Sequence, residues 1–461
     1  MESYNDLEKY LLGTSLSSPP DRDDLQPLID NIRFALIPKF GALAVIWPGI
    51  SQVLTYRSLA QSTIVSLVDD VIKPMCTAKV MTWIEVREVI GSAEALVGAV
   101  RSDTLAKVKE ASLSFLSLYD FSEGQDDGVI VIQDTVSLLG IEKLQEGVVT
   151  ALERALEQFL GANSAVRPVL IKAALDLKVA NETSAVIISR IQDLMLKIID
   201  SSGAQGVDDI PDQLLRYTVK QDDVLAELMT MQFYESLLDL YLPPLIFLKT
   251  RQEYFDIASI YQSSDSLGLE KSASARSLGR LSQARTELFA EIDHSLAIVK
   301  NLTVRDETDR KLLALIPGDY LAEHNSQLIR SFPVATATLL PILCNWCSSY
   351  DALGLLDLTT AKLTKLPVPE LLQVGRALAM SPAGTKALAT MPGVMEILLD
   401  RQGRSGYELM RLRGDIVDAL AEDANYEILG EFWYTKVRNE QAIGHWGDGG
   451  EVKVDLMDSA A

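Results

Sequence analysis

The chain has 461 residues, 48% of them hydrophobic, so it can bury a large apolar core. Its 42 Lys and Arg residues stand against 64 Asp and Glu residues, which gives a formal net charge of −22. An acidic surface repels phosphate, so the composition argues against a nucleic-acid-binding protein and favours a basic protein partner. The three cysteines are too few for a disulfide framework and fit a reducing compartment.

Residues 1–91 are predicted to form N-terminal helical repeats that diverge from the rest of the chain. The first residues are acidic and lack the positive start and apolar centre of a secretory signal. The most hydrophobic run, 34–50, contains Pro38 and Pro48 and falls short of the ~20 apolar residues that span a membrane. We therefore expect a buried helix–turn–helix in this run and no membrane contact. Another short helix is expected over about 82–89.

Residues 92–262 are predicted to form central repeats, and the two helix pairs between Ser92 and Gly161 have the clearest pattern. Their predicted bounds are 93–101, 104–119, 129–139 and 141–160, with Gly161 as a left-handed stop. Apolar residues of the last helix share one face at three- and four-residue steps: Ile141, Leu144, Val148, Leu152, Ala155 and Phe159. Such a pair cannot bury its apolar faces alone, so neighbouring pairs must stack on both sides, as in an α-solenoid.

The pattern continues with a helix pair between 165 and 199, and a short helix then opens at Pro211. Asp222 or Asp223 is predicted to cap the next helix, which ends before the proline break at 243–244.

Residues 263–282 differ in character, because they contain six serines before Leu281, few apolar residues and the cations Lys271, Arg276 and Arg280. We predict a mobile excursion from the solenoid, with a docking or phosphorylation segment as the alternative.

Residues 283–443 are predicted to form C-terminal helical repeats, and 444–461 a loose acidic tail. The last helical stretch is expected over 406–440. Helical patterns recur along the chain without a block of strands. The expected fold is therefore all-α, a curved solenoid of about 11 HEAT- or armadillo-like helix pairs with a concave partner-binding face.

Residues of the types that commonly act in catalysis or metal binding do not form a recognisable motif in the sequence. His294, His324 and His445 are scattered without metal-ligand spacing. Cys344 and Cys347 have the spacing of a redox motif, but they follow a helical apolar pattern without a preceding strand, so half-buried core thiols are the better interpretation.

Paired carboxylates at 69–70 and 222–223 lie at predicted helix ends, where they would act as caps and dipole partners. No phosphate-binding loop or nucleophile elbow is present in the sequence. We therefore predict no enzyme, with no catalytic residue, no cofactor and no metal.

Several short segments, taken in order, resemble the family of the 26S proteasome non-ATPase regulatory subunit 5, dedicated chaperones of the regulatory-particle base. They include LVGAVRSD at 96–103, ALERAL at 151–156, QLLR at 213–216, WCSS at 346–349, PVPEL at 367–371 and ALAMSP at 377–382. The likeness extends over about 95–420 and is best in the C-terminal third.

This resemblance implies a curved solenoid that holds the C-terminal domain of a proteasomal ATPase subunit and leaves before the mature particle forms. It also implies no catalytic residue. We expect a free monomer in the cytoplasm, with the nucleus left open as a second location, and no nucleic-acid or membrane partner.

In HEAT and armadillo pairs the shorter helix commonly lines the inner surface, so polar residues of 93–101, 211–217 and 394–401 are candidates for partner contact. The candidate residues are Asp212, Arg216, Tyr217, Glu396 and Asp400. The alternative for each is a solvated residue on an amphipathic helix. The alternative function is an acidic helical-repeat adaptor or import receptor that binds basic protein segments.

Overall fold

The structure is a computed structural model. It describes residues 65, 67–79, 81–121, 125–162, 165–181, 184–202, 209–221, 223–240, 242–334, 336–401 and 406–444. The predicted helix–turn–helix at 34–50, Asp222, His445 and the tail after 444 lie outside these residues.

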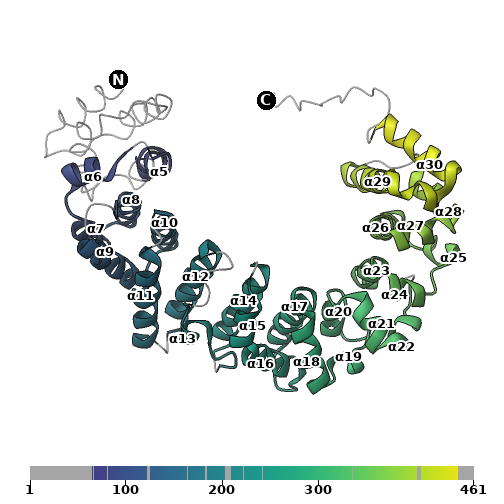
Figure 1. Cartoon of the computed structure of the whole chain (residues 1–461), viewed down its shortest axis with the longest axis horizontal. Helices are drawn as coiled ribbons and strands as arrows, with labels where there is room; N and C mark the ends of the chain where they lie inside the picture. The colour runs from purple at the N-terminus through teal and green to yellow at the C-terminus, as the bar shows by residue number, and fades with distance from the viewer. Residues whose placement is uncertain are drawn as a thin grey trace, which may run out of the picture. The chain divides into compact units, whose positions relative to one another are not determined.

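The chain divides into two compact units, unit 1 (Met1–Thr250) and unit 2 (Arg251–Ala461). The boundary falls inside the segment 92–262 that the sequence groups as central repeats. Every regular element among the described residues is helical, and successive helices stack as pairs within each unit (Figure 1). This confirms the predicted all-α solenoid class.

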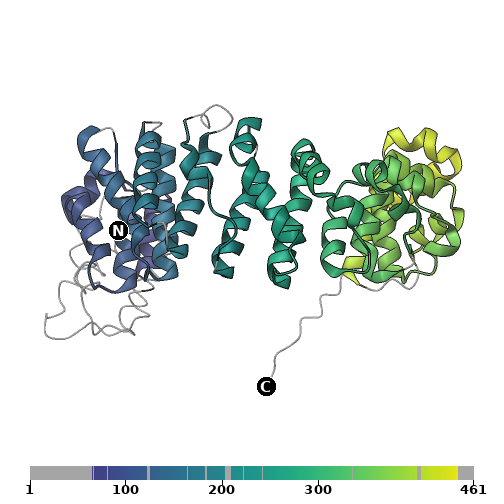
Figure 2. The same cartoon turned by 90° about the horizontal axis from the view of Figure 1, so that it is seen from below.

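In the described residues of unit 1, most helices form two rows. Its elements are η1 (Leu67–Ile72), α5 (Lys73–Thr77), α6 (Trp83–Ile90), α7 (Ala93–Arg101), α8 (Ala106–Leu116), α9 (Gln125–Ser137), η2 (Leu138–Gly140), α10 (Glu146–Ala162), α11 (Val166–Ala180), α12 (Ala185–Ser202), α13 (Asp212–Leu215), α14 (Val224–Asp239) and α15 (Pro244–Lys249). Helices α8, α10, α12 and α14 contact one another in order, as do α7, α9, α11 and α13. Figure 1 shows the first row on the inner side of the bend of unit 1 and the second row on its outer side, and Figure 2 shows the helices standing side by side.

Local sequence signals set several helix starts. Thr82 and Glu85 form a reciprocal capping box at the start of α6, and the Ser92 side chain accepts the Ala95 N–H at the start of α7. Asp223 caps α14 by accepting the Leu225 N–H, as predicted. These polar residues satisfy N–H groups that have no partner inside the helix, so the capped starts could be predicted from the sequence.

Helix α10 differs from its predicted bounds at both ends. It begins at Glu146 because Ile141 is extended after the turn of η2, and it continues through Gly161 to Ala162, so the predicted left-handed stop is wrong. The predicted apolar face is nevertheless real, because Val148, Leu152 and Phe159 are buried. Phe159 packs edge-on against Phe121, with ring centroids 5.1 Å apart.

Unit 2 repeats the paired arrangement. Its elements are α16 (Arg251–Gln262), α17 (Gly268–Ala284), α18 (Thr286–Leu296), α19 (Ile298–Asn301), α20 (Glu307–Leu313), α21 (Gly318–His324), α22 (Ser326–Arg330), η4 (Ala337–Leu339), α23 (Leu340–Cys347), α24 (Tyr350–Leu355), α25 (Thr360–Leu363), α26 (Val368–Ala379), α27 (Pro382–Ala389), α28 (Pro392–Leu399), α29 (Tyr407–Leu420), η5 (Asp423–Asn425) and α30 (Tyr426–Ile443). The stretch predicted as one helix over 406–440 is thus two helices separated by η5.

The serine-rich segment 263–282 is not a mobile excursion, and that prediction is wrong. It forms most of α17, which packs against α16, α18 and α20. Ser274 and Ser282 are fully buried, and their hydroxyls donate to the backbone carbonyls of Ile257 and Gly279. A Cβ atom on Gly279 would lie 2.4 Å from Leu315 Cβ. Small residues are therefore required because a neighbouring chain segment approaches this helix closely.

In the described part of the chain, no helix is both long and apolar enough to cross a membrane.

Candidate partner-binding surfaces

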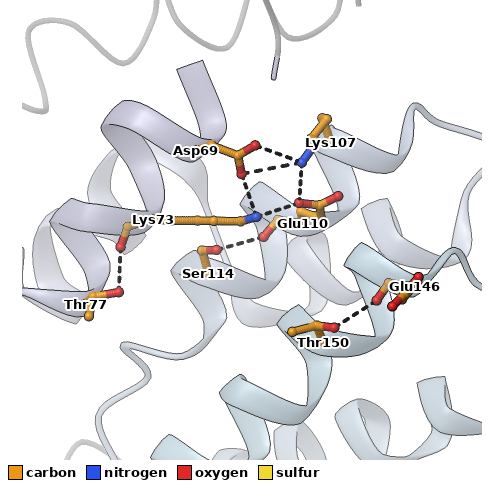
Figure 3. Close-up of polar contacts among 8 residues, drawn as sticks. All are labelled: Asp69, Lys73, Thr77, Lys107, Glu110, Ser114, Glu146 and Thr150. Atoms are coloured by element: carbon orange, nitrogen blue, oxygen red, sulfur yellow. Dashed lines mark hydrogen bonds and ion pairs between the residues drawn. The ribbon is translucent and has the colours of Figure 1, made fainter. Parts of the chain in front are cut away.

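Four charged side chains form a partly buried cluster between η1, α5 and α8 in unit 1 (Figure 3). Lys73 Nζ lies 2.6 Å from Asp69 Oδ1 and 2.7 Å from Glu110 Oε2. Lys107 Nζ lies 3.1 Å from Asp69 Oδ2 and 2.8 Å from Glu110 Oε2. Asp69 was expected to act as a helix-end cap, but it lies within η1 and binds two ammonium groups instead.

The cluster is electrically compensated. Burial alone would raise the pKa of Asp69, but the hydrogen bonds from Lys73 and Lys107 outweigh it and lower that pKa. Burial would lower the pKa of Lys107, but its bonds to Glu110 and Asp69 raise it. Each carboxylate of the cluster thus contacts both ammonium groups. We therefore assign the cluster a structural role, joining η1 and α5 to α8.

A second group of charges lies between α10 and α12, in the inner row of unit 1 (Figure 1). Lys197 Nζ lies 3.6 Å from Glu153 Oε2 and 3.9 Å from Glu157 Oε2. Desolvation and the nearby Glu153 charge raise the pKa of Asp193 to about 6, and the Lys197 charge opposes them only in part. We call Glu153, Glu157 and Asp193 the inner carboxylate group. Lys197, and Arg190 near Glu153, offset part of this negative charge, and the pKa of Asp193 is still raised, so an added cation would be stabilised there.

The three predicted contact residues around α13 lie close together but differ in exposure. Asp212 is exposed and pairs with Lys249, whose Nζ lies 3.1 Å from Asp212 Oδ1. Arg216 is also exposed, and its Nε donates to the Lys249 carbonyl oxygen at 3.1 Å.

Tyr217, by contrast, is buried, and its ring packs edge-on against Phe233 at 5.1 Å between centroids. Burial raises the pKa of its hydroxyl well above the usual range. A buried ring cannot contact a partner, so Tyr217 is a core residue. The short polar segment around Tyr217 does not indicate that the side chain is buried. The ring that covers it belongs to Phe233 on α14, which follows later in the chain.

Glu396 and Asp400 are exposed on α28 and just after it. The Asp400 N–H donates to the Glu396 carbonyl oxygen at 3.0 Å and closes the helix. These two residues are in unit 2 and those around α13 are in unit 1.

The expectation that the short helices line an inner surface is wrong. In Figure 1, α7 and α13 lie on the outer side of unit 1, and α28 lies on the outer side of unit 2. The rotation between successive pairs decides which helix faces inward, and the periodicity within one helix does not encode that rotation. The inner carboxylate group was missed because its members belong to two helices about 40 residues apart. The sequence offered one indication of this group, namely the charged residues of both signs within 153–157 and within 193–197.

Within the described residues, no group of three or more His, Cys, Asp or Glu side chains has the geometry to hold a metal ion. Cys347 is buried and Cys344 half-buried on α23, which confirms their interpretation as core thiols. Burial raises the pKa of Cys344 to about 11 and that of Cys347 further, so neither thiol is activated. An all-helical repeat fold of this kind is not typical of enzymes.

These features define an α-solenoid whose distinctive surfaces are charged groups on stacked helices, a class that typically binds other proteins. Residues 246–461 match the family described as "DNA mismatch repair protein HSM3, C terminal domain". The matched segment includes all of unit 2, so that part of the chain is similar to that domain.

No curated protein sequence matches the chain. Among solved structures, an engineered protein is similar at 15% identity and a TM-score of 0.36, covering 91% of this chain and 99% of that one. A structure concerned with a phosphorylation switch between cadherin and beta-catenin is similar at 12% identity and a TM-score of 0.32, covering 96% of each chain. Likenesses at this level say nothing about function.

Proposed function

We propose that this protein is a chaperone for assembly of the base of the proteasome regulatory particle. The match of residues 246–461 to the HSM3 C-terminal domain carries the proposal, because HSM3 is the yeast homologue of the proteasome base assembly chaperone family. The ordered segments between 96 and 382 resemble the same chaperone family, and they extend into unit 1.

The proposed partner is the C-terminal domain of a proteasomal ATPase subunit, which the chaperone holds as a monomer in the cytoplasm and releases before the mature particle forms. A stack of helix pairs suits this task, because each pair adds contact surface without a catalytic cleft.

The acidic side chains of this chain support a partner whose contact surface is basic. The inner carboxylate group offers three acidic side chains that Lys197 and Arg190 offset only in part. Asp212, Glu396 and Asp400 add exposed acidic side chains elsewhere. Arg216 has the opposite sign.

The runner-up is an adaptor that binds basic protein segments such as import signals, and the same inner carboxylate group favours it. The description of the matching family as a DNA mismatch repair protein suggests DNA binding as another function, but the net charge of −22 opposes it.

Affinity purification of the full chain followed by mass spectrometry tests the proposal. Base ATPase subunits should be recovered without the proteolytic core, whereas recovery of unrelated proteins carrying basic signals would favour the adaptor. Failure to recover any base ATPase would refute the chaperone assignment.

The D212K/D400K double variant tests the exposed carboxylates, and a variant with Glu153→Lys and Glu157→Lys tests the inner group. Each should weaken ATPase capture, chiefly by slowing association, while helical content stays unchanged. Capture unchanged by D212K/D400K would show that those two residues lie outside the contact, even if the inner variant loses binding.

A further inference from the structure

A groove lies on unit 2 where α21 and α24 pack side by side (Figure 1). It has a volume of about 640 Å³ and reaches Thr286 at the start of α18. Its apolar lining consists of Pro317, Ala322, the buried ring of Tyr320 and the half-buried Leu355. We call this apolar concave surface the α21–α24 groove.

Three carboxylates belong to the same lining, namely Asp319, Glu323 and Asp351. All three residues are exposed, and none of the described lining residues is a Lys or Arg. Asp319 and Glu323 are one helical turn apart on α21, so their side chains are neighbours on that helix. Asp319 Oδ1 accepts the Asp351 N–H at 3.2 Å, which brings the start of α24 beside them. Like charges at this spacing repel one another, so a cation that enters the groove would be stabilised.

The three carboxylates differ in their roles within the fold. Asp319 also accepts the hydroxyl of Ser349, the N-cap residue of α24, and is therefore structural. Neither the Glu323 nor the Asp351 side chain forms a hydrogen bond or an ion pair with another described residue. Tyr350, next to Asp351, is 75% exposed. An apolar groove beside two unpaired carboxylates and an exposed aromatic ring is a mixed surface of the kind that protein interfaces use.

We propose that the α21–α24 groove is a docking site for a basic segment of a partner protein, one that carries Lys or Arg residues beside a large apolar side chain. The apolar side chain would contact Pro317 and Leu355, and the cations would meet Glu323 and Asp351. The carboxylates spread over about one turn of α21 and the start of α24, so a segment of about five residues covers the groove.

Charge distinguishes this occupant from the others. A nucleic acid or an anionic membrane would bring negative charge to a groove rimmed by carboxylates and would be repelled. A second copy of this chain has a net charge of −22, and residues 445–461 contain four carboxylates and one lysine. A basic segment with an apolar side chain complements both the charge and the apolar lining of the groove.

This inference does not rest on the proposed chaperone function. The groove belongs to unit 2, whereas the inner carboxylate group belongs to unit 1. The residues that line the groove are separate from those that we assign to the ATPase contact.

The test uses the full chain as bait for random displayed peptides of about twelve residues. Peptides that also bind the E323K/D351N variant are removed, which discards those held by the inner carboxylate group. Both substituted side chains are exposed, so the variant should melt close to the wild-type temperature. The matched control is E431K/E427Q, which changes the net charge equally at two exposed positions of α30. Glu427 lies in the first turn of its helix, as Asp351 does.

The enriched peptides should contain at least two Lys or Arg residues and a large apolar residue. They should bind E323K/D351N about tenfold more weakly and bind E431K/E427Q as tightly as the wild type. Their binding should weaken when salt is added and when the apolar residue is replaced by Ser.

Enrichment of acidic or uncharged peptides would overturn the proposal, and so would a failure to enrich any peptide against the variant. Equal weakening by the control would overturn it as well, because the charge of the whole chain would then explain the binding. Self-association of the wild type that E323K/D351N abolishes would overturn it by assigning the groove to a second copy. None of these results depends on ATPase capture, so this proposal and the chaperone assignment can fail separately.

Discussion

Replacing Glu110 by Gln tests whether the compensated cluster of Figure 3 holds the first described elements of unit 1 to α8. The Glu110 side chain is 4% exposed and accepts from both Lys73 and Lys107. Gln keeps the shape and can place its carbonyl oxygen where Oε2 accepts from both lysines, but it removes the negative charge. Asp69 is then left to compensate both lysines.

The size of the loss follows from the burial of the partners. Removing one member of a fully buried ion pair costs about 3–5 kcal/mol. Here the lysine side chains are 21–23% exposed and keep some water, and Asp69 still binds both. We therefore expect Glu110→Gln to cost about 2 kcal/mol of local stability.

Hydrogen exchange of the α5 and α8 amides is the appropriate assay, because a stack of repeats opens locally before it unfolds as a whole. The exposed pair of Arg101 and Asp134, with 3.0 Å between Nη2 and Oδ1, provides the control. Asp134→Asn should cost well under about 1 kcal/mol.

If Glu110→Gln costs no more than the control, the cluster is an incidental surface pairing and its assignment as a structural clamp fails. A double-mutant cycle of Glu110→Gln with Lys107→Met gives the coupling directly. We expect a coupling energy of about 1 kcal/mol or more, whereas simple additivity would contradict the close contact.

Three further predictions concern single sites. The pKa of Asp193 is raised from an ordinary value of 3.8 to about 6, so the cost of ionising it in the folded chain is complete above about pH 6 and shrinks as the pH falls toward 4. Asp193→Asn should therefore stabilise the chain by about 1 kcal/mol at pH 7, after solvent screening. The gain should fade between pH ~6 and ~4 in denaturant titrations. A gain that is the same at both ends would contradict the raised pKa. Phe159→Ala removes a fully buried ring and should cost about 3–5 kcal/mol, measured as lost amide protection in α10; a cost below about 1 kcal/mol would contradict the stacking. Gly279→Ala forces a Cβ into Leu315 Cβ and should lower the melting temperature, whereas Gly354→Ala, which meets nothing within 4 Å, should leave it unchanged or raise it.

Helix existence and several helix starts were predictable because they depend on neighbours in the chain. The apolar face of α10 and the caps at Thr82, Ser92 and Asp223 all follow from spacings of a few residues. The core placement of Cys347 was predictable for the same reason, since it continues a helical apolar pattern.

Contacts between distant helices were not predictable from those spacings. The serines of α17 suggest a mobile segment by composition, but Ser274 and Ser282 are buried small residues at a close helix contact. Tyr217 suggests a polar surface residue by position, but α14 covers it.

The sequence by itself thus determined that this protein is a stack of amphipathic helix pairs with an acidic surface, because amphipathic periodicity and charge count are properties of the chain alone. Only the tertiary structure decided which charges meet. It pairs Asp69 and Glu110 with Lys73 and Lys107, and it brings Glu153, Glu157 and Asp193 together near Lys197. The physical reason is that side-chain charges interact over a few ångströms of space, and residues 30 to 40 positions apart come within that range only when their helices pack.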